Sequence, residues 1–452
     1  EAQAQAEREL RLGAAAAQAR ADAATALVRR TRAAAAVVGA LLVVAAGAAV
    51  VANRARQEAQ RQTAQAERNF NAALTGGAGL VDAVNAHLRD GGMTREVAVA
   101  LLGQAQGSLG GLAEAGAASP ALADTQARLL SSFSTVQVAL CDGRGAVARA
   151  AEAVAIAEAT LRDAPSDTAR QTLARALAAQ GAAGAADLDF KAALAAYRRA
   201  EALQAALPGA EAQEDLQTTR AGISDALLAT DDPAGAATVQ RAILAFHEAR
   251  AAERPDDPQR QGNLANSVLR MGNLELARRS YDAAAAAYAR HAGIVRALQA
   301  RQPSSVEWQR ALAINEVQSA RILAKQGDTA GAVERYRRGA ADVGRVAAAD
   351  AGNGSWQRSV IWAQINLSAT LIAGGAATEA LQVLEPALKA AAALSGPGVT
   401  AGGCLRDVAL VHDMASNELF VLDRKADAAA AAAVSLDAYQ RYAAAAPADA
   451  GR

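Results

Sequence analysis

A repeat of about 48 residues runs through most of this chain and limits the folds that it can adopt. A turn-like position, followed four and five residues later by a small or apolar pair, recurs at anchor positions whose successive spacings are 47, 43, 48, 48, 48 and 48 residues. The anchors are Asp142, Asp189, Asp232, Ser280, Asp328, Ala376 and Arg424. A regular period of this length is typical of stacked supersecondary units, each of which buries its apolar face against its neighbours.

Further columns obey the same period. An apolar side chain stands sixteen residues before every anchor but the first, from Leu173 to Val408. Tyr197, Tyr288, Tyr336 and Leu384 follow their anchors by eight residues, and Pro165, Pro255, Pro303 and Pro447 follow theirs by twenty-three. Several columns with one period indicate genuine repeats.

Each unit fits two helices, such as Trp308 to Lys325 and Thr329 to Ala349. Gly327 can adopt the left-handed conformation that ends a helix, and Asp328 can cap the next one. Pro at the unit boundary then ends the second helix, because it has no N–H to donate. Positions 20, 16, 9 and 5 residues before the anchor share one helical face, which predicts a core face holding Trp308 and Leu312 in one unit.

The openings Trp308-Gln309-Arg310 and Trp356-Gln357-Arg358 carry a family resemblance. The units resemble tetratricopeptide-type (TPR) repeats, in the long variety of bacterial signalling proteins, over about residues 122–447. The resemblance implies an all-α fold, a TPR-like αα-solenoid of about seven helix pairs over residues 113–450. Two departures are the short spacing from Asp189 to Asp232 and Cys404, which replaces the Trp of the last unit.

Residues 33–52 form an uncharged stretch with Arg residues on both sides. Twenty apolar residues suffice to span a bilayer. We therefore expect a transmembrane helix at 33–52, between a helical juxtamembrane segment at 1–32 and a helical linker at 53–112. This predicts a single-pass protein of the bacterial inner membrane, with the side of the repeat array undetermined because the flanking Arg residues balance. The alternative is a buried Ala-rich helix of a soluble bundle.

The chain begins with Glu1 and continues as a helical pattern, so we expect it to be the C-terminal part of a longer protein. In the family that it resembles, the missing N-terminal part is often an NTPase module or an effector, such as a Toll/interleukin-1-receptor-type or caspase-like domain. Coupling to such a domain is implied by the resemblance.

Composition and motifs disfavour catalysis and nucleic-acid binding. Lys+Arg and Asp+Glu are balanced at 46 each, so no net field attracts nucleic acid. The four His residues stand in different units, and no phosphate-binding loop or nucleophile motif occurs. We therefore expect no enzyme activity, cofactor or metal. Stacked units would also place Cys141 and Cys404 tens of Å apart, which predicts no disulfide between them.

One face of the first helices is the candidate binding surface. Positions 14, 10 and 7 residues before the anchor lie opposite the core face, so stacking should align them across units. They comprise Asn266, Arg270, Asn273, Ile314, Gln318, Arg321, Trp362 and Asn366. Amides and Arg suit a peptide backbone or an acidic segment, with Arg321 and Trp362 as expected hot spots. The alternative is an ordinary solvated helix face.

These observations favour a membrane-anchored, non-enzymatic TPR-like scaffold or sensor that binds a protein or peptide partner and couples to an upstream effector domain absent from this chain. The alternative is a soluble TPR adaptor whose Ala-rich N-terminal helix packs on the repeats. An enzyme with a dispersed site has no motif to support it.

Overall fold

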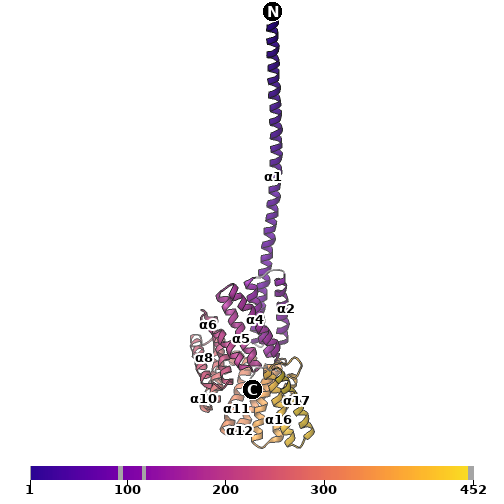
Figure 1. The fold of residues 1–452 in the computed structure, drawn as a ribbon. Coiled ribbons are helices and arrows are strands. Elements are labelled where there is room, and N and C mark those ends of the chain that lie inside the picture. Colours follow the sequence, from indigo (N-terminus) through magenta and orange to yellow (C-terminus); the bar gives the residue numbers. More distant parts are fainter. Residues whose placement is uncertain (1, 90–94, 115–118, 446–452) are drawn as a thin grey trace. The chain divides into compact units, whose positions relative to one another are not determined.

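A computed structural model describes residues 2–89, 95–114 and 119–445, and these residues contain helices and no β-strand (Figure 1). The chain divides into two compact units, Glu1–Ala72 and Ala73–Arg452. The first unit consists of a single helix, the greater part of α1 (Ala2–Arg89). The predicted boundaries at residues 32, 52 and 112 stay predictions.

The predicted membrane helix is the first correction. Within the part of the chain that the structure describes, no helix is long and apolar enough to cross a bilayer. The side chains of residues 33–46, most of the predicted span, lie outside the described ones. Ala occupies ten of the twenty positions of the segment, and Ala adds little to the free energy of insertion. The predicted inner-membrane localisation, and the membrane as a partner, are corrected on this finding.

The second unit begins with residues 73–89 of α1 and with α2 (Arg95–Glu114). Here Val81, Val84, Leu102 and Leu109 are buried. Leu109 also approaches Gly77, where an added Cβ would lie 3.1 Å from its side chain. Both segments therefore contribute apolar side chains to a core ahead of the repeats.

Helices α3 to α17 then alternate as antiparallel pairs. The first helices of the pairs are α3 (Pro120–Ala139), α5 (Asp167–Ala186), α7 (Ala210–Ala229), α9 (Pro258–Ala277), α11 (Val306–Gln326), α13 (Gly354–Ala373) and α16 (Gly402–Val421). The second helices are α4 (Gly143–Asp163), α6 (Phe190–Ala205), α8 (Pro233–Glu253), α10 (Tyr281–Arg301), α12 (Thr329–Ala349), the divided pair α14 (Ala377–Val383) and α15 (Glu385–Ala393), and α17 (Lys425–Ala445). The predicted all-α, solenoid-like repeat fold is confirmed, while the number of repeats stays a prediction.

The anchors of the repeat lie at the start of the second helices. Four Asp anchors accept a hydrogen bond from the backbone N–H three residues later, at 2.8–3.0 Å, which caps the helix. The residue before each anchor has a positive φ between 58° and 88°. These residues are Cys141, Leu188, Asp231, Arg279, Gly327, Gly375 and Asp423. The left-handed turn expected at Gly327 therefore recurs in every unit, mostly without Gly.

Small residues hold the two helices of each pair together. Ala stands four residues after every anchor and is at most 5% exposed each time. Gly, Ala or Ser stands eight residues before every anchor and faces this Ala. Three of these Ser hydroxyls, those of Ser134, Ser224 and Ser416, donate to the carbonyl oxygen of the facing Ala. The close contact of the helix backbones explains the abundance of small residues in the sequence.

The Tyr side chains that stand eight residues after their anchors, here called the Tyr column, occupy space beside Gly residues of the neighbouring helices. Tyr288 is 1% exposed, and a Cβ added at Gly272 would lie 2.5 Å from its ring. Tyr197 covers Gly181 and Gly222 in the same way. The Tyr rings at these positions therefore pack between helices.

Two irregularities have local causes. Helix α6 has 16 residues where most second helices have 21, so the five residues missing between Asp189 and Asp232 are lost from this helix. Pro386, in the first turn of α15, divides the predicted single helix at Leu384. Leu384 itself is fully buried at the place of the Tyr column.

The array of pairs curves back on itself. Figure 1 shows the yellow C-terminal pair beside the purple α4 and α5. Cys141, in the turn between α3 and α4, forms a disulfide with Cys404 of α16, across a Cα–Cα distance of 6.0 Å. The prediction of two distant cysteines is wrong because it assumed a straight stack, whereas small rotations between successive units bring the last unit to the first.

Candidate functional site

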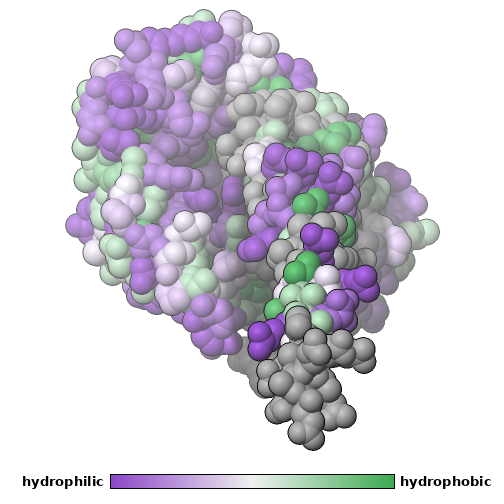
Figure 2. All heavy atoms as spheres, turned by 90° about the horizontal axis from the view of Figure 1, so that it is seen from above, coloured by the Kyte–Doolittle hydropathy of each residue, from purple (hydrophilic) through white to green (hydrophobic). Residues whose placement is uncertain are grey.

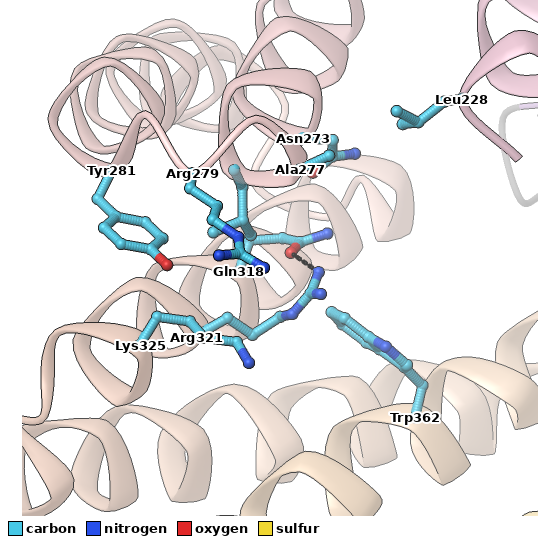
Figure 3. A pocket seen from close by; sticks show the side chains of 10 residues that line it. Leu228, Asn273, Ala277, Arg279, Tyr281, Gln318, Arg321, Lys325 and Trp362 are labelled. Carbon is cyan, nitrogen blue, oxygen red and sulfur yellow. Dashed lines mark hydrogen bonds between the residues drawn. The ribbon is translucent and has the colours of Figure 1, made fainter. Parts of the chain in front are cut away.

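Two adjoining cavities in the second unit collect most of the predicted binding residues. The first, here called the basic pocket, has a volume of about 590 Å³ and is lined by residues of α7, α9 and α11, by Trp362 of α13 and by the turn before α10 (Figure 3). The second, the polar pocket, has a volume of about 1020 Å³ and is lined by α7, α8 and α9. Asn273 lines both, so the two pockets adjoin, and together they are here called the groove.

The structure brings together six of the eight predicted residues. Asn273, Gln318, Arg321 and Trp362 line the basic pocket, and Asn266 and Arg270 join Asn273 in the polar pocket. The remaining two line neither pocket. Ile314 is half-buried in α11, and the Asn366 amide donates to the carbonyl oxygen of Trp362 within α13. That these residues bind a partner stays a prediction.

Arg321 is the central side chain of the basic pocket. Its guanidinium Nη1 donates to Gln318 Oε1 at 2.9 Å, and its Cζ lies 5.4 Å from the centre of the Trp362 ring (Figure 3). The second distance is that of a cation–π contact. Two neutral partners therefore hold the guanidinium in place without neutralising its charge.

Two more cations, Arg279 and Lys325, line the same pocket, whereas none of its lining residues is acidic. Among the described residues, neither these two nor Arg321 forms an ion pair with a carboxylate. An uncompensated cluster of three positive charges beside an aromatic ring favours an anionic group as ligand.

The floor of the basic pocket orients Asn273. The hydroxyl of Tyr288 donates to Asn273 Oδ1 at 2.9 Å. Burial raises the pKa of Tyr288 above its usual range, so this hydroxyl keeps its proton at neutral pH. Because the amide oxygen accepts from Tyr288, Asn273 Nδ2 is available as a donor to a ligand in the groove.

The polar pocket carries charges of both signs that are largely paired with one another. Arg270 pairs with Asp225, and Arg175 of α5 pairs with Asp215, at 2.6 Å, and with Glu211. The hydrogen bond from Arg175 lowers the pKa of Glu211. Asn263 Nδ2 donates to Glu214 at 3.2 Å. Five carboxylates and two Arg side chains line this end of the groove, so it is polar and not basic, in contrast to the basic pocket.

Sequence reasoning missed several of these residues. Arg175, Thr218 and Asp225 stand 14, 14 and 7 residues before their own anchors, so extending the same columns to the earlier units would have found them. Arg279, Tyr281 and Lys325 stand within three residues of an anchor. Arg279 lies in a turn, Tyr281 is the first residue of α10, and Lys325 lies in the last turn of α11, so none belongs to the predicted binding face. The stacking of one unit on the next brings them to the pocket.

The described residues contain no cluster of three or more His, Cys, Asp or Glu side chains that could hold a metal ion. His291 is enclosed between helices and does not line the groove, whereas His247 lines the polar pocket. Burial lowers the pKa of His247 and Glu214 opposes this, with Nδ1 3.9 Å from a carboxylate oxygen of Glu214.

Comparison with known proteins gives distant likenesses. No protein-family model and no curated protein sequence matches the chain. Among solved structures, a Rap protein complexed with competence and sporulation factor is 13% identical, covers 82% of this chain and 100% of its own, and has a TM-score of 0.46. Aspartyl phosphate phosphatase F from Bacillus subtilis is 10% identical, with coverages of 80% and 94% and a TM-score of 0.45. The apo quorum sensor NprR from B. thuringiensis is 12% identical, with coverages of 80% and 98% and a TM-score of 0.43.

At these sequence identities and TM-scores, nothing about the function of this chain follows from the structures that resemble it. The helix pairs, their capped turns and the small-residue contacts within each pair define the class directly. The described residues form an all-α, helical-repeat protein with a solenoid-like fold.

Proposed function

We propose that this chain is a non-enzymatic TPR-type adaptor that binds an acidic peptide segment of a protein partner in the groove. The observation that carries the proposal is the basic pocket. Arg279, Arg321 and Lys325 face it together with Trp362, and none of them is paired with a carboxylate among the described residues.

Each part of the groove has a role in this proposal. A carboxylate of the peptide enters the basic pocket, where Arg321 can donate two parallel hydrogen bonds to it. The Trp362 ring covers the apolar part of the same side chain. Asn273, Asn266 and the polar pocket bind the backbone of the neighbouring residues, because amide side chains can both donate to and accept from peptide groups.

The excess of carboxylates over Arg in the polar pocket supports a peptide rather than a nucleic acid. A phosphate backbone would require a row of unpaired cations along the whole groove. In this groove the unpaired cations are confined to one end, and the other end pairs its Arg residues internally. Coupling of peptide binding to an effector domain outside this chain remains part of the proposal.

Selection from a displayed library of random peptides tests the proposal. We expect wild-type protein to enrich peptides that contain Asp or Glu. The variant Arg321→Gln with Lys325→Gln should lose this enrichment, because it removes two of the three cations at nearly constant side-chain size. The matched control, Lys191→Gln with Arg338→Gln, changes the same charge at exposed positions that line neither pocket.

The control variant should enrich the same peptides as the wild type. If no peptide is enriched, or if the enriched peptides bind equally well to the Arg321 and Lys325 variant, the groove is not an acidic-peptide site.

A further inference from the structure

The first and last units of the array meet at a seam that the repeat pattern does not require. Cys141 follows α3 in the left-handed conformation, with φ 62°, and Cys404 lies in the first turn of α16. These are the two cysteines of the chain, and 263 residues separate them in sequence. Their disulfide therefore joins opposite ends of the array.

Hydrogen bonds surround this disulfide. The N–H groups of Thr400 and Ala401 both donate to the carbonyl oxygen of Cys141, at 2.9 Å each. The hydroxyl of Thr400 donates to Asp142 Oδ1 at 3.2 Å and accepts from the N–H of Arg144 at 3.0 Å. The two residues before α16, Thr400 and Ala401, thus bind the turn between α3 and α4 by a continuous set of polar contacts.

The backbones approach so closely that only Gly fits at several seam positions. A Cβ on Gly143 would lie 2.7 Å from Cα of Ala401, and a Cβ on Gly354 would collide with Sγ of Cys141. Gly402 donates its N–H to Asp187 Oδ1, in the turn between α5 and α6, at 2.8 Å. The seam therefore includes the N-termini of both α13 and α16.

Helix α13 connects the seam to the groove. Its first residue, Gly354, contacts the disulfide, and two turns later Trp362 lines the basic pocket. A shift of the first turn of α13 would therefore move Trp362 relative to Arg321.

We propose that the Cys141–Cys404 seam is a redox-controlled clasp, which a dithiol opens and whose opening weakens ligand binding in the groove. Cys141 is 0% and Cys404 2% exposed, so a reductant reaches the sulfurs only when the seam separates. The last part of this proposal rests on the proposed function, whereas opening of the seam does not.

A dithiol alone can reduce the Cys141–Cys404 disulfide by thiol–disulfide exchange. A thiolate of the dithiol attacks one Sγ, forms a mixed disulfide and releases the other cysteine as a thiolate. The second thiol of the reagent, once deprotonated, then attacks its own mixed disulfide and releases the first cysteine. Two cysteine thiols form by gaining two electrons and two protons, and the dithiol becomes a cyclic disulfide.

The rate of reduction tests whether the seam guards the disulfide. Native protein is treated with dithiothreitol, and free thiols are counted over time by alkylation and mass spectrometry. We expect Thr400→Ala to be reduced at least tenfold faster than the wild type, because it removes two seam hydrogen bonds. Thr238→Ala, which removes only a bond within α8, is the matched control and should be reduced at the wild-type rate.

Shape and binding are then measured on the same samples. Small-angle X-ray scattering should show a larger radius of gyration after reduction, and likewise for Cys404→Ser without a reductant. An acidic peptide selected on oxidised wild-type protein should bind at least tenfold more weakly to both. Circular dichroism should show that both keep their helices.

Two free thiols in the untreated protein would contradict the proposed clasp. Equal reduction rates for wild type and Thr400→Ala would contradict it as well, and so would an unchanged radius of gyration after reduction. A larger radius with unchanged affinity would overturn the link to the groove. If no peptide binds even to the oxidised protein, the proposed function fails, and the scattering and reduction data still decide whether the clasp opens.

Discussion

His291 in α10 is fully buried, and its environment determines its protonation state. The amide Nδ2 of Asn315 donates to the carbonyl oxygen of Tyr288 and lies 2.8 Å from His291 Nδ1. Because the amide nitrogen can only donate, Nδ1 must accept, and the imidazole is neutral with its proton on Nε2. Burial lowers the pKa of His291 from 6.5 to about 4.

This arrangement predicts a pH dependence of stability. Since the pKa of His291 is lower in the folded state, the unfolded chain binds the proton first as the pH falls. The free energy of unfolding should therefore decline from about pH 6.5 to about pH 4 by about 3 kcal/mol on account of this group, and the group should cause no further loss below that. Urea unfolding at several pH values measures the decline.

The variant His291→Gln should show a shallower decline over the same interval, because Gln does not titrate. Other acid-sensitive groups are shared by both proteins and cancel in the comparison. Identical pH dependence of the two proteins would show that His291 is not held neutral in the fold.

Leu264 and Leu312 occupy the same repeat column but differ in burial. Leu264 is 7% exposed, whereas Leu312 is only partly buried. We expect Leu264→Ala to lower the free energy of unfolding by about 2–5 kcal/mol, because it empties space between units. Leu312→Ala should lower the free energy of unfolding by a smaller amount. Chemical denaturation followed by circular dichroism gives both values, and a wild-type midpoint for Leu264→Ala would mean that the repeat alignment is wrong.

At the scale of helices, each pair depends on the absence of side-chain volume between its two members. The Ala after the anchor and the small residue before it leave room for backbone contact, or for a Tyr ring over Gly. A polar Ser in this column keeps the contact by donating to a backbone carbonyl. Small residues are therefore a structural requirement of this fold at those positions.

A matched pair of Gly substitutions tests this packing. Gly272→Ala places a methyl group 2.5 Å from the Tyr288 ring, so we expect it to destabilise the protein by about 1–3 kcal/mol. Gly293→Ala, on the exposed side of α10, meets no atom within 4 Å. It should stabilise by about 0.5–1 kcal/mol, because Ala has the higher helix propensity. Thermal unfolding of the two variants compares them, and a shift of the same sign in both would contradict the packing.

At the scale of the whole molecule, local features were predictable and long-range closure was not. The capped turns at Asp232 and Asp328 follow from residues adjacent in sequence, and the helix Thr329–Ala349 has the predicted bounds. The Cys141–Cys404 bond depends on the sum of small rotations over all intervening units, which no single column encodes. The stretch at 33–52 has the length of a membrane span, but half of its residues are Ala, which adds little to the free energy of insertion.

The candidate site was partly predictable for the same reason. Residues at a fixed helical position, such as Asn273, Gln318 and Arg321, repeat with the period and align when units stack. Arg279 comes from a turn and Lys325 from the last turn of α11, outside the predicted binding face, and both line the pocket with Trp362 (Figure 3). The face of the molecule seen in Figure 2 shows hydrophilic and hydrophobic residues interspersed.

The central claim is that the basic pocket binds a carboxylate of a peptide, and a double-mutant cycle tests it most directly. Isothermal titration measures the Kd of one selected peptide and of its Glu→Gln form, each with wild-type protein and with Arg321→Gln. Trp362 is left intact because it packs against the core. We predict a coupling energy of at least about 1 kcal/mol between Arg321 and the peptide carboxylate, as is typical of close charge pairs across an interface. A coupling energy near zero, with both proteins folded, would contradict the account.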